Sequence, residues 1–430
     1  MTPAEAISPF CDDELRPLAA EMFAELRRIS FDGVGITRES FGPLENAAQD
    51  IVARVAVENG LAIAHDRVRN LIVTLPGQEP DKPFIATGSH LDSVPRGGNY
   101  DGAAGVIAGL LALIHLRRHN ITPARTVKLI ALRGEESAWF GKSWIGSHAL
   151  FGLLTANDLA QPRYDNRRPL RAYLEDVGAD VAAIDRGEVL LDPSTVAAFL
   201  EVHIEQGPVL EASGLPVGIV TGIYGNLRHM DIACRGQAAH AGATPRALRR
   251  DAVVAIAALI MRMDTHWKLW LESGKQLAIT HGIIGTDPAE HAISRIPGTA
   301  RFSAEIRADD QATLDGFYAL LRKEAAAIAT GRNVEFTFDA AIINRPAPMS
   351  LAWIDELERL CAAEAVPQMR LPSGAGHDAA VFAYAGIPSA MIFIRNAHGS
   401  HNPDEHMEMD DFLQATRVLT RALCLPPING

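Results

Sequence analysis

Apolar runs of strand length alternate with helical patterns in the first half of the chain. One such run leads into His90, a second leads into Glu135, and a third ends at His203. Strands that alternate with helices build a largely parallel sheet with helices on both faces. Ligands collect at the carboxyl ends of the strands in such sheets. The sequence therefore predicts an α/β fold that brings these three side chains to one sheet edge.

A different rhythm of elements marks an inserted domain. Strands and helices are expected in the order βαββαβ, at residues 230–234, 250–265, 276–284, 300–307, 311–330 and 334–338. Such a pattern can fold as its own small unit, and 430 residues exceed what one core usually organises. We expect a catalytic domain of residues 1–213 and 342–430, with a mixed, mostly parallel sheet flanked by helices. Residues 214–341 form the insertion.

Composition narrows the possible partners and compartment. A net charge of -12 without a long basic run disfavours nucleic acid and anionic membranes as partners. No stretch of about twenty apolar residues and no signal-peptide pattern is present. Cys11, Cys234, Cys361 and Cys424 are isolated, without the C-x-x-C spacing of a zinc ribbon. We expect a cytoplasmic protein that acts on a small molecule.

Five residues of metal-ligand type follow strands or lie in loops rich in Gly, Ser, Asn or Pro: His90, Asp101, Glu136, His203 and His401. A divalent metal of borderline hardness accepts imidazole and carboxylate together. Two such ions, roughly 3.5 Å apart, need a shared anion to offset their repulsion. Asp101 is the expected bridge. His90 and His203 are expected to complete one site, and Glu136 and His401 the other.

Two further acids are expected to act in catalysis. Asp92, two residues after His90, suits accepting the other ring N–H of that ligand and fixing its tautomer. Glu135 can act as general base on a metal-activated water and later protonate the leaving nitrogen. Taken alone, Glu135-Glu136 is more often a charged strand end. The run G-G-N-Y-D-G-A-A-G suggests a phosphate loop, but it lacks the Lys-Ser/Thr that follows the glycines in such loops.

Seven motifs then occur in the order of one family: T-G-S-H-L-D-S-V-P, G-G-N-Y-D-G-A-A-G-V, G-E-E-S, H-I-E-Q-G-P-V-L-E, G-Q-A-A-H-A-G-A-T-P, S-G-A-G-H-D-A and G-S-H-N-P-D-E. On these motifs the chain resembles the metal-dependent amidohydrolase branch of the M20 peptidase superfamily. This branch includes N-carbamoyl-L-amino-acid hydrolases, β-ureidopropionases and allantoate amidohydrolases. Exopeptidases and aminoacylases of the superfamily typically have a longer stretch between the first His and the bridging Asp, and a carboxylate where His203 stands.

The resemblance implies the same ligands, with Glu135 as base and Asp92 orienting, in a di-metal aminopeptidase-like catalytic domain. It adds a lid and dimerisation function for the insertion. His240 resembles the lid histidine that reaches the partner subunit's active site and polarises the scissile carbonyl, although alone it suggests a polar turn residue. Arg307 resembles the residue that grips the substrate carboxylate, which suits a guanidinium fork. Further substrate contacts are implied at Gln206, Gly374, Ala375, Gly376 and His377.

Three positions depart from the family pattern. The family motif N-V-I-P-G is S-R-I-P-G here, so Ser294 stands where an Asn helps to bind the carboxylate. His291 replaces a second Asn, and Arg246 replaces a Met. These changes leave three alternatives: a shifted carboxylate, a longer β-amino-acid-type substrate, or a substrate whose polar end is not a carboxylate.

We expect a homodimeric two-metal amidohydrolase that cleaves the carbamoyl C–N bond of an N-carbamoyl-L-amino acid or related ureido acid. Zinc is the expected metal, and manganese, cobalt or nickel suit the same ligands. The alternatives are an allantoate or ureidoglycolate amidohydrolase, a β-ureidopropionase, an aminoacylase or dipeptidase, and a non-catalytic binding protein. The last is disfavoured because no expected ligand or base is missing.

Overall fold

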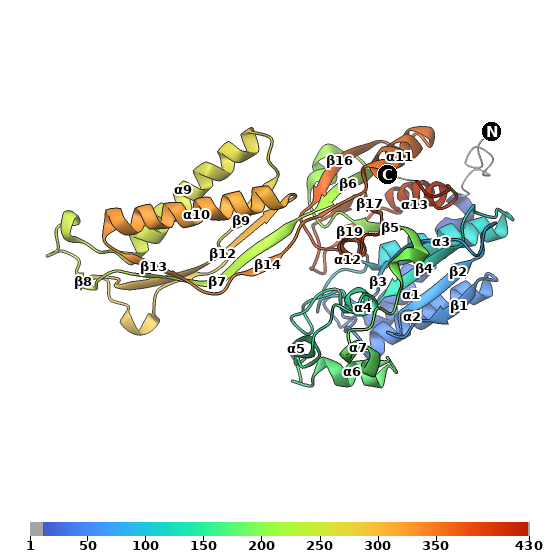
Figure 1. The fold of residues 1–430 in the computed structure, drawn as a ribbon, viewed down its shortest axis with the longest axis horizontal. Coiled ribbons are helices and arrows are strands. Elements are labelled where there is room, and N and C mark those ends of the chain that lie inside the picture. Colours follow the sequence, from blue (N-terminus) through green and yellow to red (C-terminus); the bar gives the residue numbers. More distant parts are fainter. Residues whose placement is uncertain (1–11, 429–430) are drawn as a thin grey trace. The chain divides into compact units, whose positions relative to one another are not determined.

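The computed structural model describes residues 12–428. The chain divides into unit 1, Met1–Thr221 with Met349–Gly430, and unit 2, Gly222–Pro348 (Figure 1). The division lies later at both ends than the sequence predicts. Strand β6 (Val217–Ile223), at the first junction, pairs with β17 in the sheet of unit 1.

A nine-stranded sheet forms the centre of unit 1, in the order β1-β2-β4-β3-β5-β17-β6-β15, with β16 added to β6. Its four middle strands are parallel: β4 (Val127–Leu132), β3 (Phe84–His90), β5 (Val196–Ile204) and β17 (Ser389–Ile394). Four outer strands pair antiparallel: β1 (Ala62–His65), β2 (Leu71–Leu75), β6 and β15 (Ala347–Pro348). β16 spans Gln368–Ser373. The predicted α/β class is confirmed.

Burial explains why the middle strands are almost continuously apolar. Every residue of β3 and β17 is buried, as is nearly every residue of β5. Helix α3 (Ala103–Arg118) packs on β3, β4 and β5 and is itself covered by α1 (Asp12–Ser30) and α13 (Met409–Leu423). A helix that is apolar all round belongs in such a buried layer.

The remaining helices of unit 1 are mostly short: α2 (Pro43–Glu58), α4 (Ile145–Leu150), α5 (Ala156–Leu159), α6 (Leu170–Asp176), α7 (Val181–Asp185), α8 (Val209–Ser213), α11 (Leu351–Ala363) and α12 (Asp378–Tyr384). α2 begins at Pro43, because proline suits the first helical position. The sequence does not predict α4 to α7, because a helix of one or two turns shows too little periodicity.

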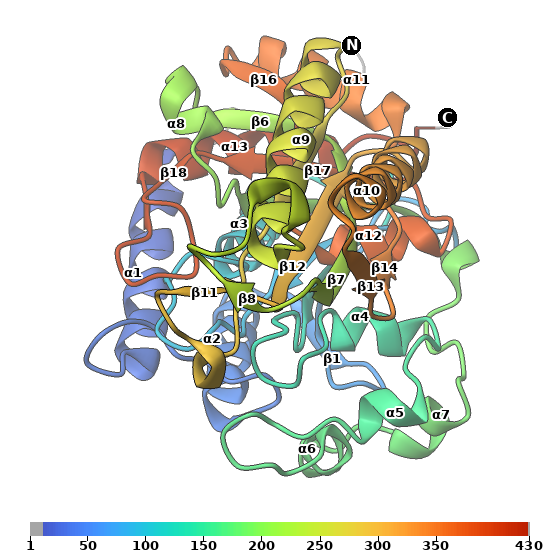
Figure 2. The same ribbon diagram turned by 90° about the vertical axis from the view of Figure 1, so that its left-hand side faces the viewer.

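Unit 2 is an antiparallel sheet in the order β10-β12-β7-β13, with β14 on β7 and β9 on β12. Its strands are β7 (Gly225–Arg235), β9 (Leu277–Thr280), β10 (Ile284–Gly285), β12 (Thr299–Ala308), β13 (Glu335–Phe338) and β14 (Ile342–Asn344). The strand predicted at 276–284 is therefore two strands. Helices α9 (Ala252–Glu272) and α10 (Gln311–Arg332) contact each other, β7 and β12, so they share one face (Figures 1 and 2). Their core includes Ile256, Leu259, Phe302 and Phe317.

The strand order of unit 1 has a topological switch point at β3. From β3 the chain passes to β4 on one side of β3, and then to β5 on the other side. Loops that leave adjacent parallel strands in opposite directions open a ligand site at the carboxyl ends. β3 ends there at His90, and His203 is the last but one residue of β5.

Two sequence expectations concern cysteines and membranes. Cys234, Cys361 and Cys424 are buried free thiols, and Cys11 lies outside the described residues. Within residues 12–428, no helix is both long enough and apolar enough to cross a membrane.

Candidate metal centre

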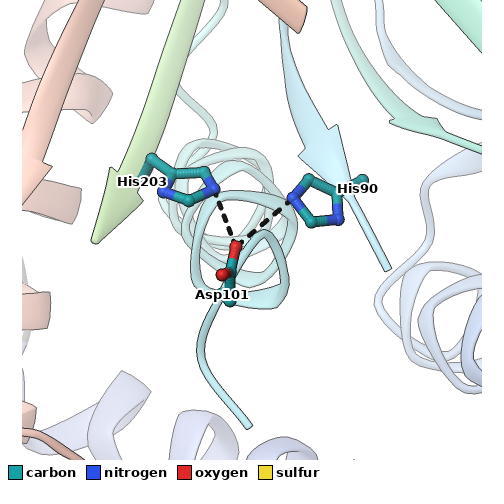
Figure 3. Close-up of side chains that lie close together, drawn as sticks. All are labelled: His90, Asp101 and His203. Atoms are coloured by element: carbon teal, nitrogen blue, oxygen red, sulfur yellow. Dashed lines mark ion pairs between the residues drawn. The ribbon is translucent and has the colours of Figure 1, made fainter. Parts of the chain in front are cut away.

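The five predicted ligands converge at the carboxyl edge of the sheet of unit 1. His90 is the last residue of β3, and His203 is the last but one of β5. Asp101 lies just before α3, and Glu136 lies in the loop after β4. His401 lies between the short strands β18 (Asn396–Ala397) and β19 (His406–Met407). Figure 3 shows the two strand-borne histidines facing Asp101 from neighbouring strands.

Asp101 presents one carboxylate oxygen to each of two groups. Its Oδ1 lies 3.5 Å from His90 Nε2 and 3.2 Å from His203 Nε2 (Figure 3). Its Oδ2 lies 3.3 Å from His401 Nε2, which lies 3.6 Å from Glu136 Oε1. Within each group the potential ligand atoms lie within 4.8 Å of one another. The residues thus have the relative positions that the predicted two-metal centre requires.

A glycine allows this approach. Gly102 has φ +65°, and a Cβ there would come within 2.5 Å of the His90 ring. Any other residue at this position would push the imidazole away from Asp101.

The orientation of the ring nitrogens fits bound cations. Nδ1 of His90 lies 3.1 Å from the Asp92 carbonyl oxygen, and Nδ1 of His203 lies 2.8 Å from that of Ile204. Each Nδ1 therefore donates a hydrogen, which leaves an Nε2 lone pair facing a carboxylate oxygen. Glu136 Oε1 is buried and has no hydrogen-bond partner within the described chain. Facing acceptors at these distances need a positive charge between them, and this donor set suits borderline divalent metals.

The raised pKa values of Glu136 and His401 also indicate that the centre favours positive charge. Burial, and then the charge of Asp101, raises the pKa of Glu136 to about 8. The hydrogen bond with Asp101 raises the pKa of His401 to about 9. Burial acts to raise the pKa of Asp101, but its contacts with the three histidines hold it well below its usual range. The centre therefore attracts protons or cations around one carboxylate that stays ionised.

Asp92 connects the first histidine to the predicted base. Its Oδ1 lies 3.3 Å from His90 Nδ1 and accepts the backbone N–H of Glu135 at 3.2 Å. Its Oδ2 accepts the backbone N–H of Glu136 at 3.1 Å and the hydroxyl of Ser40 at 2.5 Å. Glu135 Oε2 lies 3.9 Å from His90 Nε2, and burial raises the pKa of Glu135 well above its usual range. Asp92 thus orients both the histidine and the Glu-Glu turn.

Two residues that sequence reasoning missed hold Asp101. Glu405 Oε1 accepts the backbone N–H groups of Tyr100 at 2.9 Å and Asp101 at 3.2 Å. The Ser400 hydroxyl lies 2.6 Å from both Asp101 Oδ2 and Glu405 Oε2. Both residues belong to the G-S-H-N-P-D-E motif around His401, and that membership is the signal that could have found them.

The predicted substrate contacts of unit 1 lie against the same ligands. Gln206 Nε2 donates to Asp101 Oδ2 at 2.8 Å. His377 is buried, its Nε2 lies 2.8 Å from Ser373 Oγ, and its ring meets that of His203 edge-on at 4.5 Å. Gln206 therefore contacts the proposed ligand Asp101, and His377 contacts the proposed ligand His203. Gly374, Ala375 and Gly376 form the loop between β16 and α12.

His240 and Ser294 lie together in unit 2. His240, in β8 (Ala239–His240), pairs with Arg295 in β11 (Arg295–Ile296), and the N–H of Ala241 donates to the Ser294 carbonyl at 2.7 Å. His240 is exposed, and its Nδ1 accepts two backbone N–H groups at 3.1 and 3.2 Å, those of Ala243 and Gly242. The ring hydrogen therefore lies on Nε2.

His291 and Arg307 lie elsewhere in unit 2. His291 Nε2 lies 2.7 Å from Thr286 Oγ1, in the wall of a cavity of about 320 Å³ that Glu290 and Arg295 also line. Arg307 is the last but one residue of β12 and pairs with Asn226 of β7. Its Nη2 lies 3.0 Å from Glu305 Oε1. Unit 2 thus keeps Arg307 apart from His240 and Ser294.

Known proteins resemble the chain over almost its whole length. The sequence profile of "Peptidase family M20/M25/M40" matches residues 86–424. An N-carbamoyl-L-amino acid amidohydrolase of Geobacillus stearothermophilus is 35% identical, with 90% of this chain and 92% of that protein covered. An allantoate amidohydrolase of Escherichia coli K12 is 31% identical, with the same coverage. The crystal structure of a hydantoinase/carbamoylase family amidase from Burkholderia multivorans superposes with a TM-score of 0.86 at 28% identity, covering 95% of this chain and 97% of that one.

Proposed function

Since the chain belongs to peptidase family M20/M25/M40, we propose that it hydrolyses the carbamoyl C–N bond of an N-carbamoyl-L-amino acid or a related ureido acid. The family and the class of hydrolase predicted from the motifs are confirmed, because the relatives are amidohydrolases that act on non-peptide C–N bonds. The choice of substrate is our proposal. The products would be the amino acid, carbon dioxide and ammonia.

One observation carries the mechanism: Asp101 offers one oxygen to His90 and His203 and the other to His401 and Glu136. We assign these residues as ligands of two divalent ions, with zinc as the first choice and manganese, cobalt or nickel as alternatives. When bound, such ions polarise a carbonyl oxygen and lower the pKa of water toward about 7.

Glu135 is the proposed proton carrier. It takes the proton of the water that attacks the carbamoyl carbon, and gives it to the leaving nitrogen as the C–N bond breaks. Asp92 keeps the Glu135 backbone in place by accepting its N–H, and holds the His90 ring through the contacts of Nδ1 with the Asp92 carbonyl oxygen and Oδ1. The Glu135 carboxylate then acts in both steps, the attack of water and the departure of the nitrogen.

His240 and Arg307 are the proposed substrate residues of unit 2. With Nδ1 occupied, His240 has Nε2–H to donate to the scissile carbonyl oxygen. The Arg307 fork suits a substrate carboxylate. Along β12, Arg307 lies eight residues from Thr299, the end nearer to His240, a span of roughly 26 Å at about 3.3 Å per residue. A small ureido acid cannot bridge that span, which supports a homodimer in which His240 serves the partner's site.

The residues expected at the polar end of the substrate depart from the family pattern. Ser294 and His291 stand where the resemblance expects asparagines, so a longer ureido acid is a real alternative. Allantoate, ureidoglycolate and N-carbamoyl-β-alanine are therefore tested beside the N-carbamoyl-L-amino acids. The buried free thiols of Cys234, Cys361 and Cys424 support a reducing compartment, which we propose to be the cytoplasm.

The test is ammonia release by metal-stripped protein reconstituted separately with zinc and manganese. The panel contains the four ureido classes above. N-acetyl-amino acids are assayed beside them for acetate release, which would instead indicate an aminoacylase. Metal-dependent release from one ureido class supports the proposal. Glu135→Gln should abolish release while two metals remain bound, and near-normal kcat in that variant would refute the role of Glu135.

A further inference from the structure

Trp144 contacts the proposed base without belonging to the metal centre. It lies in the loop between β4 and α4, and its indole Nε1–H donates to Glu135 Oε1 at 2.7 Å. We propose that Trp144 is a positioning residue that holds the Glu135 carboxylate with its other oxygen, Oε2, toward His90. This inference rests on the proposed function of Glu135 as base.

The backbone fixes Trp144 beside Glu135. The N–H groups of Trp144, Ile145 and Gly146 donate to the carbonyl oxygens of residues 135, 134 and 133, at 2.9, 2.8 and 2.8 Å. These three bonds join the loop to the segment that carries the base. Trp144 has φ 59° and ψ 39°, a left-handed conformation that a bulky residue rarely adopts. Such strain persists where the surroundings over-determine it, most often at functional sites.

A glycine makes room for the indole. A Cβ at Gly376 would come within 2.2 Å of Trp144 Cζ2. The ring therefore lies directly against Gly376. The indole thus contacts Gly376 on one side and Glu135 through its N–H.

The contact matters because of what a general base must do. A carboxylate that accepts and then returns a proton must present the same oxygen at both steps. Glu135 Oε2 lies 3.9 Å from His90 Nε2, whereas Oε1 is bound by Trp144. Only 12% of the Glu135 side chain is exposed. Without the indole N–H, rotation about the last side-chain bond would carry Oε2 away from the site of proton transfer.

The experiment compares Trp144→Phe with a matched control, Trp139→Phe. Trp139 is buried, and its indole N–H also donates a hydrogen bond, at 2.8 Å, but to the backbone carbonyl of Ser93. Trp144→Phe should lower kcat by roughly 10- to 100-fold, as expected for one lost hydrogen bond to a carboxylate. KM and a content of two metals should stay unchanged. Trp139→Phe should lower the melting temperature and leave kcat within about twofold of the parent value.

Two further variants separate positioning from folding. Gly376→Ala keeps the indole but displaces it, so kcat should fall as it does in Trp144→Phe. In a Glu135→Asp background the carboxylate no longer reaches Trp144, so adding Trp144→Phe should change kcat no further. Unchanged kcat in Trp144→Phe, with two metals bound, overturns the inference. If Glu135→Gln is also active, the proposed function of Glu135 fails; if it is inactive, only the inference on Trp144 fails.

Discussion

Removing the Glu405 side chain should weaken metal binding although Glu405 is not itself a proposed ligand. Its carboxylate accepts the N–H groups of Tyr100 and Asp101 and lies 2.6 Å from Ser400 Oγ. Only 6% of Glu405 is exposed, so water cannot fully replace these contacts. Glu405→Ala would leave two backbone donors without their acceptor.

The magnitude follows from the bonds lost. An unsatisfied buried donor costs about 1–3 kcal/mol, so two cost about 2–6 kcal/mol, part of which the loop recovers by moving. Movement of this loop shifts Asp101, the residue common to both metal groups. Loss of such a supporting residue typically lowers metal affinity by about 10- to 100-fold. We expect a decrease in that range for Glu405→Ala.

The assay is zinc competition against a chromophoric chelator, with metal content measured after dialysis. Glu405→Gln is the conservative variant, because it keeps an oxygen for both N–H groups and can donate to Ser400. It should bind metal nearly as well as the parent. Asp339→Ala is the matched control: Asp339 accepts the N–H groups of Met230 and Asp231, at 3.0 and 3.2 Å, in unit 2. It should lower stability only. Parental zinc affinity in Glu405→Ala would refute the reasoning.

Three further predictions concern stability and substrate binding. Burial lowers the pKa of His148 to about 4. Below pH 6.5 the unfolded chain therefore gains a proton at this residue that the folded chain does not. The free energy of unfolding should fall by about 2 kcal/mol from pH 7 to pH 5 for this reason. Urea unfolding of His148→Asn should lack that part of the fall, and an unchanged pH dependence would exclude His148 as its source. A chelator should lower the melting temperature, because each metal ion present at 100 times its Kd adds about 2.7 kcal/mol to the free energy of unfolding. Equal melting curves with and without metal would count against tight metal sites in the folded protein. Arg307→Lys should raise KM by roughly 10-fold or more and change kcat less, because Lys cannot form the two parallel hydrogen bonds of the guanidinium fork. An unchanged KM for carboxylate substrates would mean that Arg307 does not bind the carboxylate.

Elements with a strong local pattern were predictable. The helix predicted at 311–330 is α10 apart from its last two residues, and the strand predicted at 334–338 is β13 apart from its first predicted residue. Where pairing partners set the limits, prediction was poorer. β7 extends over Gly225–Arg235 although the sequence favours only 230–234, because β12, β13 and β14 all pair with it. The ends of a strand depend on its neighbours, which local sequence does not specify.

The sequence by itself determined the chemistry available to this protein. Imidazole and carboxylate groups at strand ends and in Gly-rich loops predict a hydrolytic metal centre, because residue type decides what can bind a cation or carry a proton. Only the tertiary structure decided how those groups are held. Glu405 reaches Asp101 across 304 positions of sequence, and Trp144 reaches Glu135 only because its loop folds back on the strand end. Contacts of this kind depend on loop conformation and packing, and a single sequence carries no periodic signal for either.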